Sequence, residues 1–353
     1  MSSNQRAVIL ASLRGQTFRI PDLHAVFSGW PQDTSRHLPS IVPAMDSILD
    51  SNACSDAMTK KLKQEDLATL TARWWPVADL ETLLDLAQFV ACIFSTDGMI
   101  DQASGPGKDK TQAFQALHRS TDKFVEQRLD MSRDAKVPRS SDSLINSFRV
   151  LSGLLRKRYT IEQQKMFLDE AKFTMEMLNL QQKLRLDGKI PSLAEYCTYR
   201  QGSCCINAMV ALVEYGNSLC IPGEVMNNPD MKVLKKEAVH ANWITNDIVS
   251  VKKELASGFV ENLVVLCASD GNAQTGVDTA VKHLRSSVER FEVAAAKLAT
   301  YYAGDKALAE DIGKFVQGCR CMCMGSYTWS LTSKRYGLEE MKRDGAGGLV
   351  VVV

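Results

Sequence analysis

The sequence predicts a single all-α domain, and three observations lead to this fold class. After about residue 45, apolar residues recur at spacings of three and four, which is typical of helices that bury one face. No stretch alternates apolar and polar residues for long enough to predict a sheet, and no repeat or low-complexity linker divides the chain. With 353 residues, the chain can bury a substantial core. We therefore expect one bundle of many long helices.

The two ends of the chain differ from this helical pattern. Residues 1–45 are interrupted by several prolines, which predict an irregular N-terminal strap. The C-terminal sequence RDGAGGLVVVV is rich in glycine, and a flexible tail is expected over residues 339–353. The helical domain is therefore expected over residues 46–338.

The segment from Pro76 to Asp101 predicts a long buried helix. Proline is favoured at a helix start, and the segment carries apolar residues over much of its circumference. The helix should end at an acidic tip, and the glycines from Gly98 onward predict a loop after it. Further helices are expected at residues 109–130, 140–157, 161–186, 192–219, 229–257, 273–303 and 305–333.

The composition limits the partners of the protein. Hydrophobic residues make up 45% and charged residues 24% of the chain, and the formal net charge is +1. Because the charges are so nearly balanced, we expect neither nucleic acid nor an anionic membrane as a partner. No apolar run approaches the roughly 18 to 20 residues of a membrane span. The first residues lack the pattern of a secretory signal, so we expect a cytoplasmic protein.

Ten cysteines raise the question of disulfides or a metal cluster. In a chain of this length without a secretory signal, reduced thiols are the better expectation. Cys319, Cys321 and Cys323 could suggest zinc, but steps of two point about 200° apart on a helix, so the middle thiol faces away. No CxxC pair or histidine partner completes a zinc site, and structural thiols are favoured.

The sequence NDIVSVKKE places three oxygen-bearing side chains on one face of a predicted helix. Asn246, Ser250 and Glu254 stand four residues apart, with Lys253 beside the last. Oxygen ligands of this kind suit Mg²⁺, which is held by few protein groups plus water and phosphate. The alternative is a solvated helix face.

A second acidic pair, Asp97 and Asp101, also stands four residues apart at the end of the predicted buried helix. Two carboxylates at a helix C-terminus interact unfavourably with the helix dipole, and a nearby cation would offset this cost. A surface acid pair is the simpler interpretation, but the apolar helix before it favours a functional one. The two acidic faces could converge on one mouth of the bundle and hold several Mg²⁺ ions there.

These motifs resemble those of class I terpene synthases of the microbial, single-domain type, particularly fungal ones. NDIVSVKKE contains the family's N-D-x-x-S-x-x-x-E motif in full, and DGMID resembles its aspartate-rich motif, with Gly98 where a second acid is usual. Arg200 precedes Asn246 by 46 residues, as the family's pyrophosphate-sensing arginine does. Arg335 and Tyr336 match its C-terminal Arg-Tyr pair, and the resemblance spans about residues 18 to 336.

The resemblance implies a class I terpenoid synthase helical bundle around an apolar active-site cavity. It implies a lyase of isoprenoid secondary metabolism that ionises and cyclises a linear prenyl diphosphate and releases pyrophosphate. Chains of this size resemble sesquiterpene synthases, so farnesyl diphosphate is the expected substrate. Three Mg²⁺ ions are expected as cofactors, and Mn²⁺ could substitute for them.

The same resemblance assigns the site residues. The expected metal ligands carry oxygen and lie on the two motifs, at Asp97, Asp101, Asn246, Ser250 and Glu254. The groups expected to hold the diphosphate are Arg200, Lys253, Arg335 and Tyr336. A guanidinium suits this anion because it presents two parallel donors to phosphate oxygens. Apart from Asp101 and Lys253, we expect all of these residues to be catalytic.

The carbocation left after ionisation must cyclise without water, and aromatic faces could stabilise it by about 0.5 to 2 kcal/mol each. Phe89 and Trp329 are expected to line its pocket, with Phe94 and Tyr215 as further candidates. The family often breaks the helix after its sensing arginine. Ser203 and Cys204 occupy that turn, although Cys204 could equally be a small core residue.

Alternative functions remain open at this stage. A monoterpene or diterpene cyclase would differ in the chain length of its substrate. A chain-elongating prenyl transferase would be expected to carry two aspartate-rich motifs, whereas the second motif here is built of Asn, Ser and Glu. If the protein were a non-enzymatic helical scaffold, Gly98 would mark a position at which a metal ligand has been lost. A homodimer is compatible with the sequence.

Overall fold

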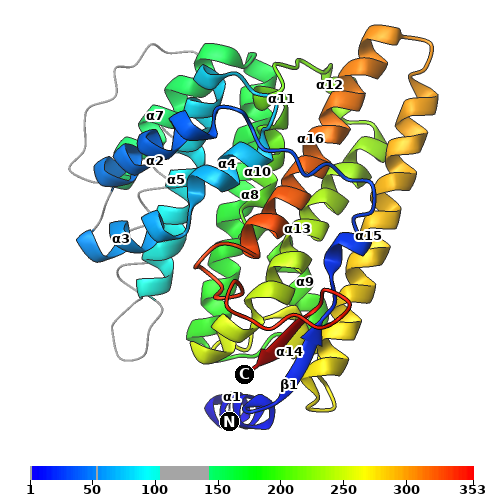
Figure 1. Ribbon diagram of the computed structural model, residues 1–353. Coiled ribbons are helices and arrows are strands. Elements are labelled where there is room, and N and C mark those ends of the chain that lie inside the picture. Colours follow the sequence, from blue (N-terminus) through cyan, green and yellow to red (C-terminus); the bar gives the residue numbers. More distant parts are fainter. Residues whose placement is uncertain (1, 53–54, 104–142) are drawn as a thin grey trace.

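The computed structural model describes residues 2–52, 55–103 and 143–353, and most of them are helical (Figure 1). The N-terminal half contains α1 (Ser2–Leu13), β1 (Thr17–Ile20), α2 (Leu38–Asn52), α3 (Asp56–Gln64), α4 (Leu67–Trp74), α5 (Leu80–Ala103), α7 (Ser143–Arg158) and α8 (Ile161–Leu186). The C-terminal half contains α9 (Leu193–Ser203), α10 (Ile206–Ala211), α11 (Val213–Gly216), α12 (Gly223–Met226), α13 (Pro229–Ala256), α14 (Leu263–Cys267), α15 (Ala273–Tyr301), α16 (Lys306–Ser330) and β2 (Leu349–Val352). The predicted helix at 109–130 lies outside the described residues.

Local sequence signals explain where several of these helices begin. Thr160 and Gln163 form a capping box at α8, in which each side chain bonds the backbone N–H of the other. Ser192 and Glu195 do the same at α9. Pro229 opens α13, where the missing proline N–H would have no helical partner. The predicted helices at 161–186, 229–257 and 273–303 are accordingly close to α8, α13 and α15.

Helix α13 lies inside the bundle, between α15, α16 and the short helices α9 and α10 (Figure 1). Its apolar residues Leu234, Ala238, Ala241 and Ile248 are fully buried. Burial of a side chain the size of leucine contributes about 1.5 to 3 kcal/mol. The long helix therefore anchors the fold, and its C-terminal half is held firmly enough to position polar side chains.

Helix α4 approaches α16 closely because α16 carries a glycine at the contact. A Cβ atom added to Gly325 would lie 3.0 Å from both Cβ of Arg73 and Cδ1 of Trp74. Trp74 is buried there and donates from Nε1 to Oγ of Ser326 at 2.9 Å. The close packing brings this indole to the wall of the cavity described below.

Both chain ends contain regular elements that the expected strap and tail do not include, although residues 21–37 are largely irregular. Residues 2–13 form α1, and β1 pairs antiparallel with β2, so that Phe18 faces Val351 and Ile20 faces Leu349. These four side chains are each at most 3% exposed, so the strands are held by burial against the bundle. Each strand has four residues, too few for alternation to be read from sequence. The C-terminus consequently lies beside β1 (Figure 1).

Helix α5 also differs from its prediction, because it begins at Leu80 and continues through Gly98 to Ala103. A single glycine inside a helix costs only about 1 kcal/mol relative to alanine, so it does not by itself end the helix.

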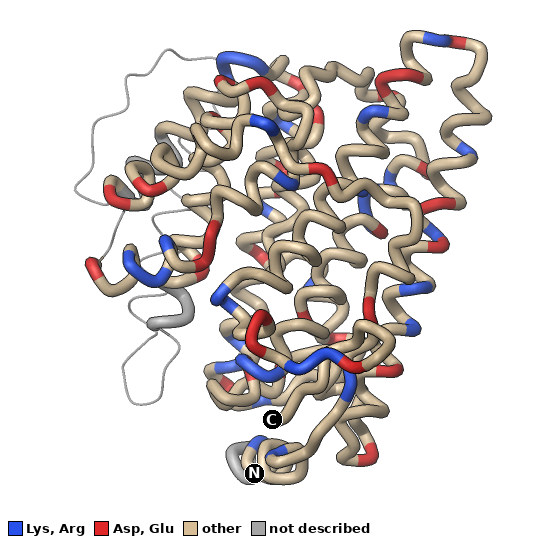
Figure 2. Tube along the Cα trace, viewed as in Figure 1, with Lys and Arg blue, Asp and Glu red and all other residues tan. Residues whose placement is uncertain are grey.

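Figure 2 shows that positions of Lys and Arg and positions of Asp and Glu are interspersed along the chain. Within the described residues, no helix is long and apolar enough to cross a membrane. The cysteines that the structure describes are free thiols, and Cys319, Cys321 and Cys323 are buried in α16.

Candidate active site

The polar row predicted on α13 lies on one face of the helix. Oγ of Ser250 donates to Oε1 of Glu254 at 2.8 Å, and Nδ2 of Asn262 donates to Oε2 of the same carboxyl group at 3.0 Å. One turn before Ser250, Nδ2 of Asn246 donates to the Tyr336 hydroxyl at 2.8 Å. Burial raises the pKa of Glu254, and the nearby carboxylate of Asp247 raises it further. A cation bound beside Glu254 would therefore favour the ionised form of its carboxyl group.

Arg200 reaches this row from α9. Its Nη2 donates to Oδ1 of Asn246 at 2.8 Å and to Oδ1 of Asp247 at 2.9 Å. Asp247 is fully buried, and its second oxygen accepts from the Leu263 N–H at 2.9 Å and from the Tyr196 hydroxyl. Burial lowers the pKa of Arg200, but Asp247 raises it well above its ordinary value overall. Asp247 therefore anchors the guanidinium, a role that the spacing of the motif does not predict.

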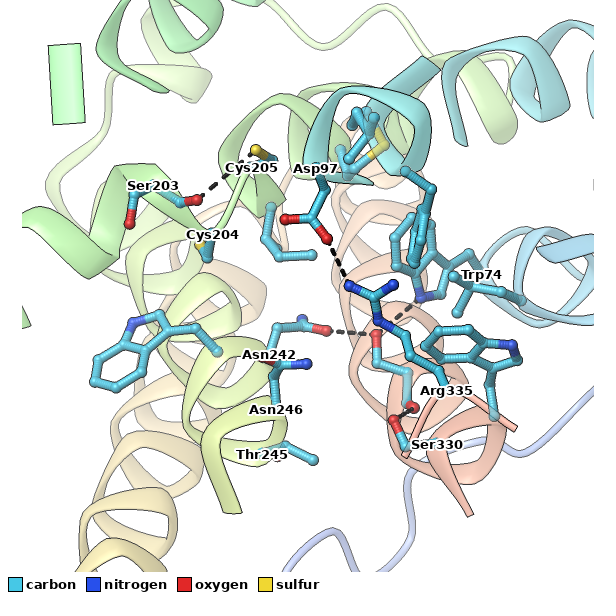
Figure 3. A pocket seen from close by; sticks show the side chains of 18 of the residues that line it. Trp74, Asp97, Ser203, Cys204, Cys205, Asn242, Thr245, Asn246, Ser330 and Arg335 are labelled. Atoms are coloured by element: carbon cyan, nitrogen blue, oxygen red, sulfur yellow. Dashed lines mark hydrogen bonds and ion pairs between the residues drawn. The ribbon is translucent and has the colours of Figure 1, made fainter. Parts of the chain in front are cut away.

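Arg335 links the aspartate of α5 to a buried glutamate. Its Nη2 donates to Oδ2 of Asp97 at 2.5 Å, and its Nη1 donates to Oε2 of Glu65 at 2.8 Å. Figure 3 shows the Asp97 carboxyl group facing the guanidinium across the pocket. Desolvation raises the pKa of Asp97, but the charges of Arg335 and Lys253 lower it overall. The predicted Arg335 and Asp97 are thus in direct contact.

Two adjoining cavities meet at these residues, each with a volume of about 140 Å³. Residues that line both are Asp97, Arg200, Ser203, Asn246 and Arg335. The first cavity is mostly apolar, and its large side chains are Leu70, Trp74, Ile93, Phe94, Ile206, Met209, Trp243, Trp329 and Tyr336. The second is mostly polar, and its charged side chains also include Arg185, Lys253, Glu254 and Glu261. The charged groups therefore lie at the junction of an apolar and a polar chamber.

Two of the four aromatic residues expected at the site lie at the apolar cavity, and two do not. Phe94 and Trp329 line the apolar cavity, and their ring centroids are 5.6 Å apart. Phe89 does not line it, because that ring is 1% exposed and packs on Phe167 and Tyr215. Eight residues before Asp97, the position of Phe89 is rotated about 80° around the helix, which turns it toward α8 and α11. Tyr215 is likewise outside this cavity.

The helix that carries Arg200 is broken immediately after it. Helix α9 ends at Ser203, and Cys205 adopts a left-handed backbone conformation with φ 62° before α10 begins. Cys204 lines the apolar cavity beside the break and also packs against the hydrophobic core, so it fits both alternatives. Gly202 has a different role, because a Cβ there would lie 2.5 Å from Cγ of Met177 on α8.

The unusual Gly98 in the aspartate-rich segment has a packing explanation. A Cβ at this position would lie 2.5 Å from Sδ of Met58, which is buried on α3. The methionine therefore fills the space that a larger residue at 98 would need. The side chain of Asp101 lies outside the described residues.

The donor set fits a divalent cation. Asp97, Asn246 and Glu254 all present oxygen atoms and line the polar cavity, and oxygen is the ligand type that hard cations prefer. Two of these oxygens already attract cationic groups, since Asp97 accepts from Arg335 and Asn246 accepts from Arg200. Ser250 adds a hydroxyl beside Glu254.

The chain is similar to known terpene synthases and terpene cyclases. A family model described as "Terpene synthase family 2, C-terminal metal binding" matches residues 88–292. The sesquiterpene cyclase hepA of Aspergillus oryzae is 28% identical over 365 aligned positions, which cover 99% of this chain and 97% of that protein. Terpene cyclase braA of Annulohypoxylon truncatum is 23% identical and covers 97% of this chain and 92% of its own length.

Solved structures show the same fold. An α-eudesmol synthase superimposes with a TM-score of 0.74 at 18% identity, covering 86% of this chain and 98% of its own. A hedycaryol synthase in complex with HEPES also has a TM-score of 0.74, at 17% identity, with coverage of 90% and 100%. The predicted all-α fold class is confirmed.

Proposed function

Because this chain belongs to the terpene synthase family and is a terpene cyclase, we propose that it converts farnesyl diphosphate to a cyclic sesquiterpene and pyrophosphate in the presence of Mg²⁺. The observation that carries the proposal is the convergence of Asp97 from α5, Asn246 from α13 and two arginines at the mouth of an apolar cavity. The similarity to a sesquiterpene cyclase along nearly the whole chain supports the C15 substrate.

In this proposal Asp97, Asn246, Ser250 and Glu254 hold Mg²⁺, with Asp101 as a further ligand. When bound, Mg²⁺ would neutralise the diphosphate oxygens and make pyrophosphate a better leaving group. The identity and the number of the ions, three by analogy with the family, are part of the proposal.

Arg200 and Arg335 bind the diphosphate from two sides. Each guanidinium is fixed by a buried acid, Asp247 in one case and Glu65 in the other. Fixed donors lose little conformational entropy when they bind an anion, and they lie where negative charge grows as the C–O bond breaks. Lys253 lines the same polar cavity, and the Tyr336 hydroxyl contacts Asn246 at its edge.

The apolar cavity receives the prenyl chain. Trp74, Phe94, Trp243 and Trp329 line it and leave little room for water near the allylic carbon. Their rings could stabilise a passing carbocation by roughly 0.5 to 2 kcal/mol each. The shape of this wall, rather than a dedicated base, would select the product.

The test is incubation of the purified protein with geranyl, farnesyl and geranylgeranyl diphosphates, with and without Mg²⁺, followed by GC-MS. We expect a cyclic C15 product from farnesyl diphosphate that requires Mg²⁺ and is lost in Asn246→Ala. A C10 or C20 product would replace the substrate assignment. A longer prenyl chain formed with added isopentenyl diphosphate would indicate a prenyl transferase, and no turnover at all would reject the proposal.

A further inference from the structure

Glu65 is a buried acid outside both motifs of the site. It lies between α3 and α4, is 2% exposed, and contacts Nη1 of Arg335 through Oε2 at 2.8 Å. Its other carboxylate oxygen has no hydrogen-bond partner among the residues that the structure describes. A buried carboxylate is costly unless it is paired, so the contact with Arg335 is the interaction that compensates its burial.

The backbone at Glu65 is held independently of its side chain. The carbonyl of Glu65 accepts from Nε1 of Trp329 at 2.8 Å and from Oγ of Ser333 at 2.9 Å. Its N–H donates to the Leu62 carbonyl at 3.1 Å. These three hydrogen bonds fix the backbone at Glu65 without the side chain. The carboxylate is therefore not needed for the local fold, and its partner is Arg335.

The two ends of the Arg335 guanidinium face different surroundings. Nη1 points to Glu65 in the interior, whereas Nη2 points to Asp97, whose side chain is 45% exposed at the polar cavity. The aromatic ring of Phe94 lies 5.1 Å from Cζ and restricts the plane of the group. One end is therefore held while the other is presented to the junction of the two cavities.

We propose that Glu65 is a positioning residue that holds Arg335 by Nη1 and so directs Nη2 toward the diphosphate. The proposal rests on the proposed function, which gives Arg335 its anion. A guanidinium with one fixed end can exchange the acceptor at its other end without reorienting. Asp97 and a phosphate oxygen are two such acceptors, and Glu65 remains the partner of Nη1 in either case.

The experiment compares Glu65→Gln with Glu237→Gln. Glu237 is a matched control, since it is also a buried glutamate paired with an arginine, Arg290 at 2.8 Å, but it does not line either cavity. Calorimetry measures the affinity for inorganic pyrophosphate in Mg²⁺, and steady-state kinetics measures kcat and KM for farnesyl diphosphate. We expect E65Q to weaken pyrophosphate binding and to lower kcat/KM by about tenfold, and E237Q to change neither by more than about twofold.

A double-mutant cycle separates positioning from a general structural effect. If Glu65 acts through Arg335, then E65Q has no further effect on pyrophosphate affinity in an Arg335→Gln background. An equal loss in both backgrounds, or no loss in E65Q alone, would overturn the proposal. If E65Q does not fold, Glu65→Asp keeps the charge but draws it away from Nη1, and unchanged pyrophosphate affinity would then refute positioning.

The two proposals fail in different ways. Wild-type protein that binds pyrophosphate but converts none of the three prenyl diphosphates would reject the proposed function and leave the role of Glu65 to be decided by binding. Wild-type protein that does not bind pyrophosphate in Mg²⁺ would overturn the role of Glu65, because Arg335 would have no anion to receive.

Discussion

Asp247→Asn is expected to be strongly destabilising, even though it changes the shape of the side chain little. The carboxylate is fully buried and accepts from four donors, which are Nε and Nη2 of Arg200, the Tyr196 hydroxyl and the Leu263 N–H. An asparagine keeps one oxygen and turns its NH₂ group toward a donor. The substitution therefore removes the charge that compensates a buried guanidinium and leaves donors unpaired.

Breaking a buried ion pair by neutralising one partner costs about 3 to 5 kcal/mol. Arg200 has a side chain that is 16% exposed, so water can relieve little of this cost. Since whole domains are stable by about 5 to 15 kcal/mol, the change should remove a large share of the total.

Urea unfolding monitored by circular dichroism measures this loss. The control is Glu310→Gln, which removes one charge from an exposed pair with Lys314 and should leave the free energy of unfolding near that of the wild type. A loss below about 1 kcal/mol for Asp247→Asn would show that Arg200 does not depend on the buried charge, and the argument from burial would be wrong.

Two further predictions concern the cavity wall and the chain ends. Phe94→Leu should alter the product distribution in GC-MS because Phe94 lines the apolar cavity, whereas Phe89→Leu should leave the products unchanged and reduce stability by roughly 1 to 3 kcal/mol. A product change of equal size in both variants would contradict the placement of these rings. Val351→Asp should lower the melting temperature by several degrees, because it puts an unpaired carboxylate where the side chain is 1% exposed. Val352→Asp is its control at a position 53% exposed, and equal melting temperatures would argue against a docked tail.

The parts of this protein that sequence predicts well are those in which the signal is local. Apolar periodicity predicts α8 at its observed bounds, and the structure adds a capping box at its start. The row on α13 follows from residue spacing, since Ser250 and Glu254 are one turn apart on any helix. By contrast, β1 and β2 are four residues each and acquire their structure by pairing across the whole chain, through contacts such as Thr17 with Val352.

In the site, too, local signals are predictable from sequence and long-range contacts are not. Spacing and family resemblance located Arg200 and Arg335, and the structure places both at the junction of the cavities. Their partners were harder to find. Glu65 lies 270 residues before Arg335 in a segment without a motif, and no periodicity connects them. Asp247 was visible as part of the N-D-x-x-S-x-x-x-E motif, but its contact with Arg200 depends on how α9 packs against α13.

The charges of the site explain why a cation and an anion should bind it together. Arg335 neutralises Asp97, and Arg200 contacts Asn246, so the candidate metal ligands and the diphosphate donors satisfy one another in the structure. A diphosphate alone would compete with Asp97 for Nη2 of Arg335 and leave that carboxylate with less positive charge beside it. A divalent cation alone would compete with Arg335 for Asp97 and leave Glu65 as the acidic partner of the guanidinium. When both bind, the cation replaces Arg335 as the partner of Asp97, and the diphosphate replaces Asp97 as the partner of Nη2 of Arg335. The electrostatic cost of separating the internal pairs is then offset on both sides, which favours coupled over sequential occupation of the site.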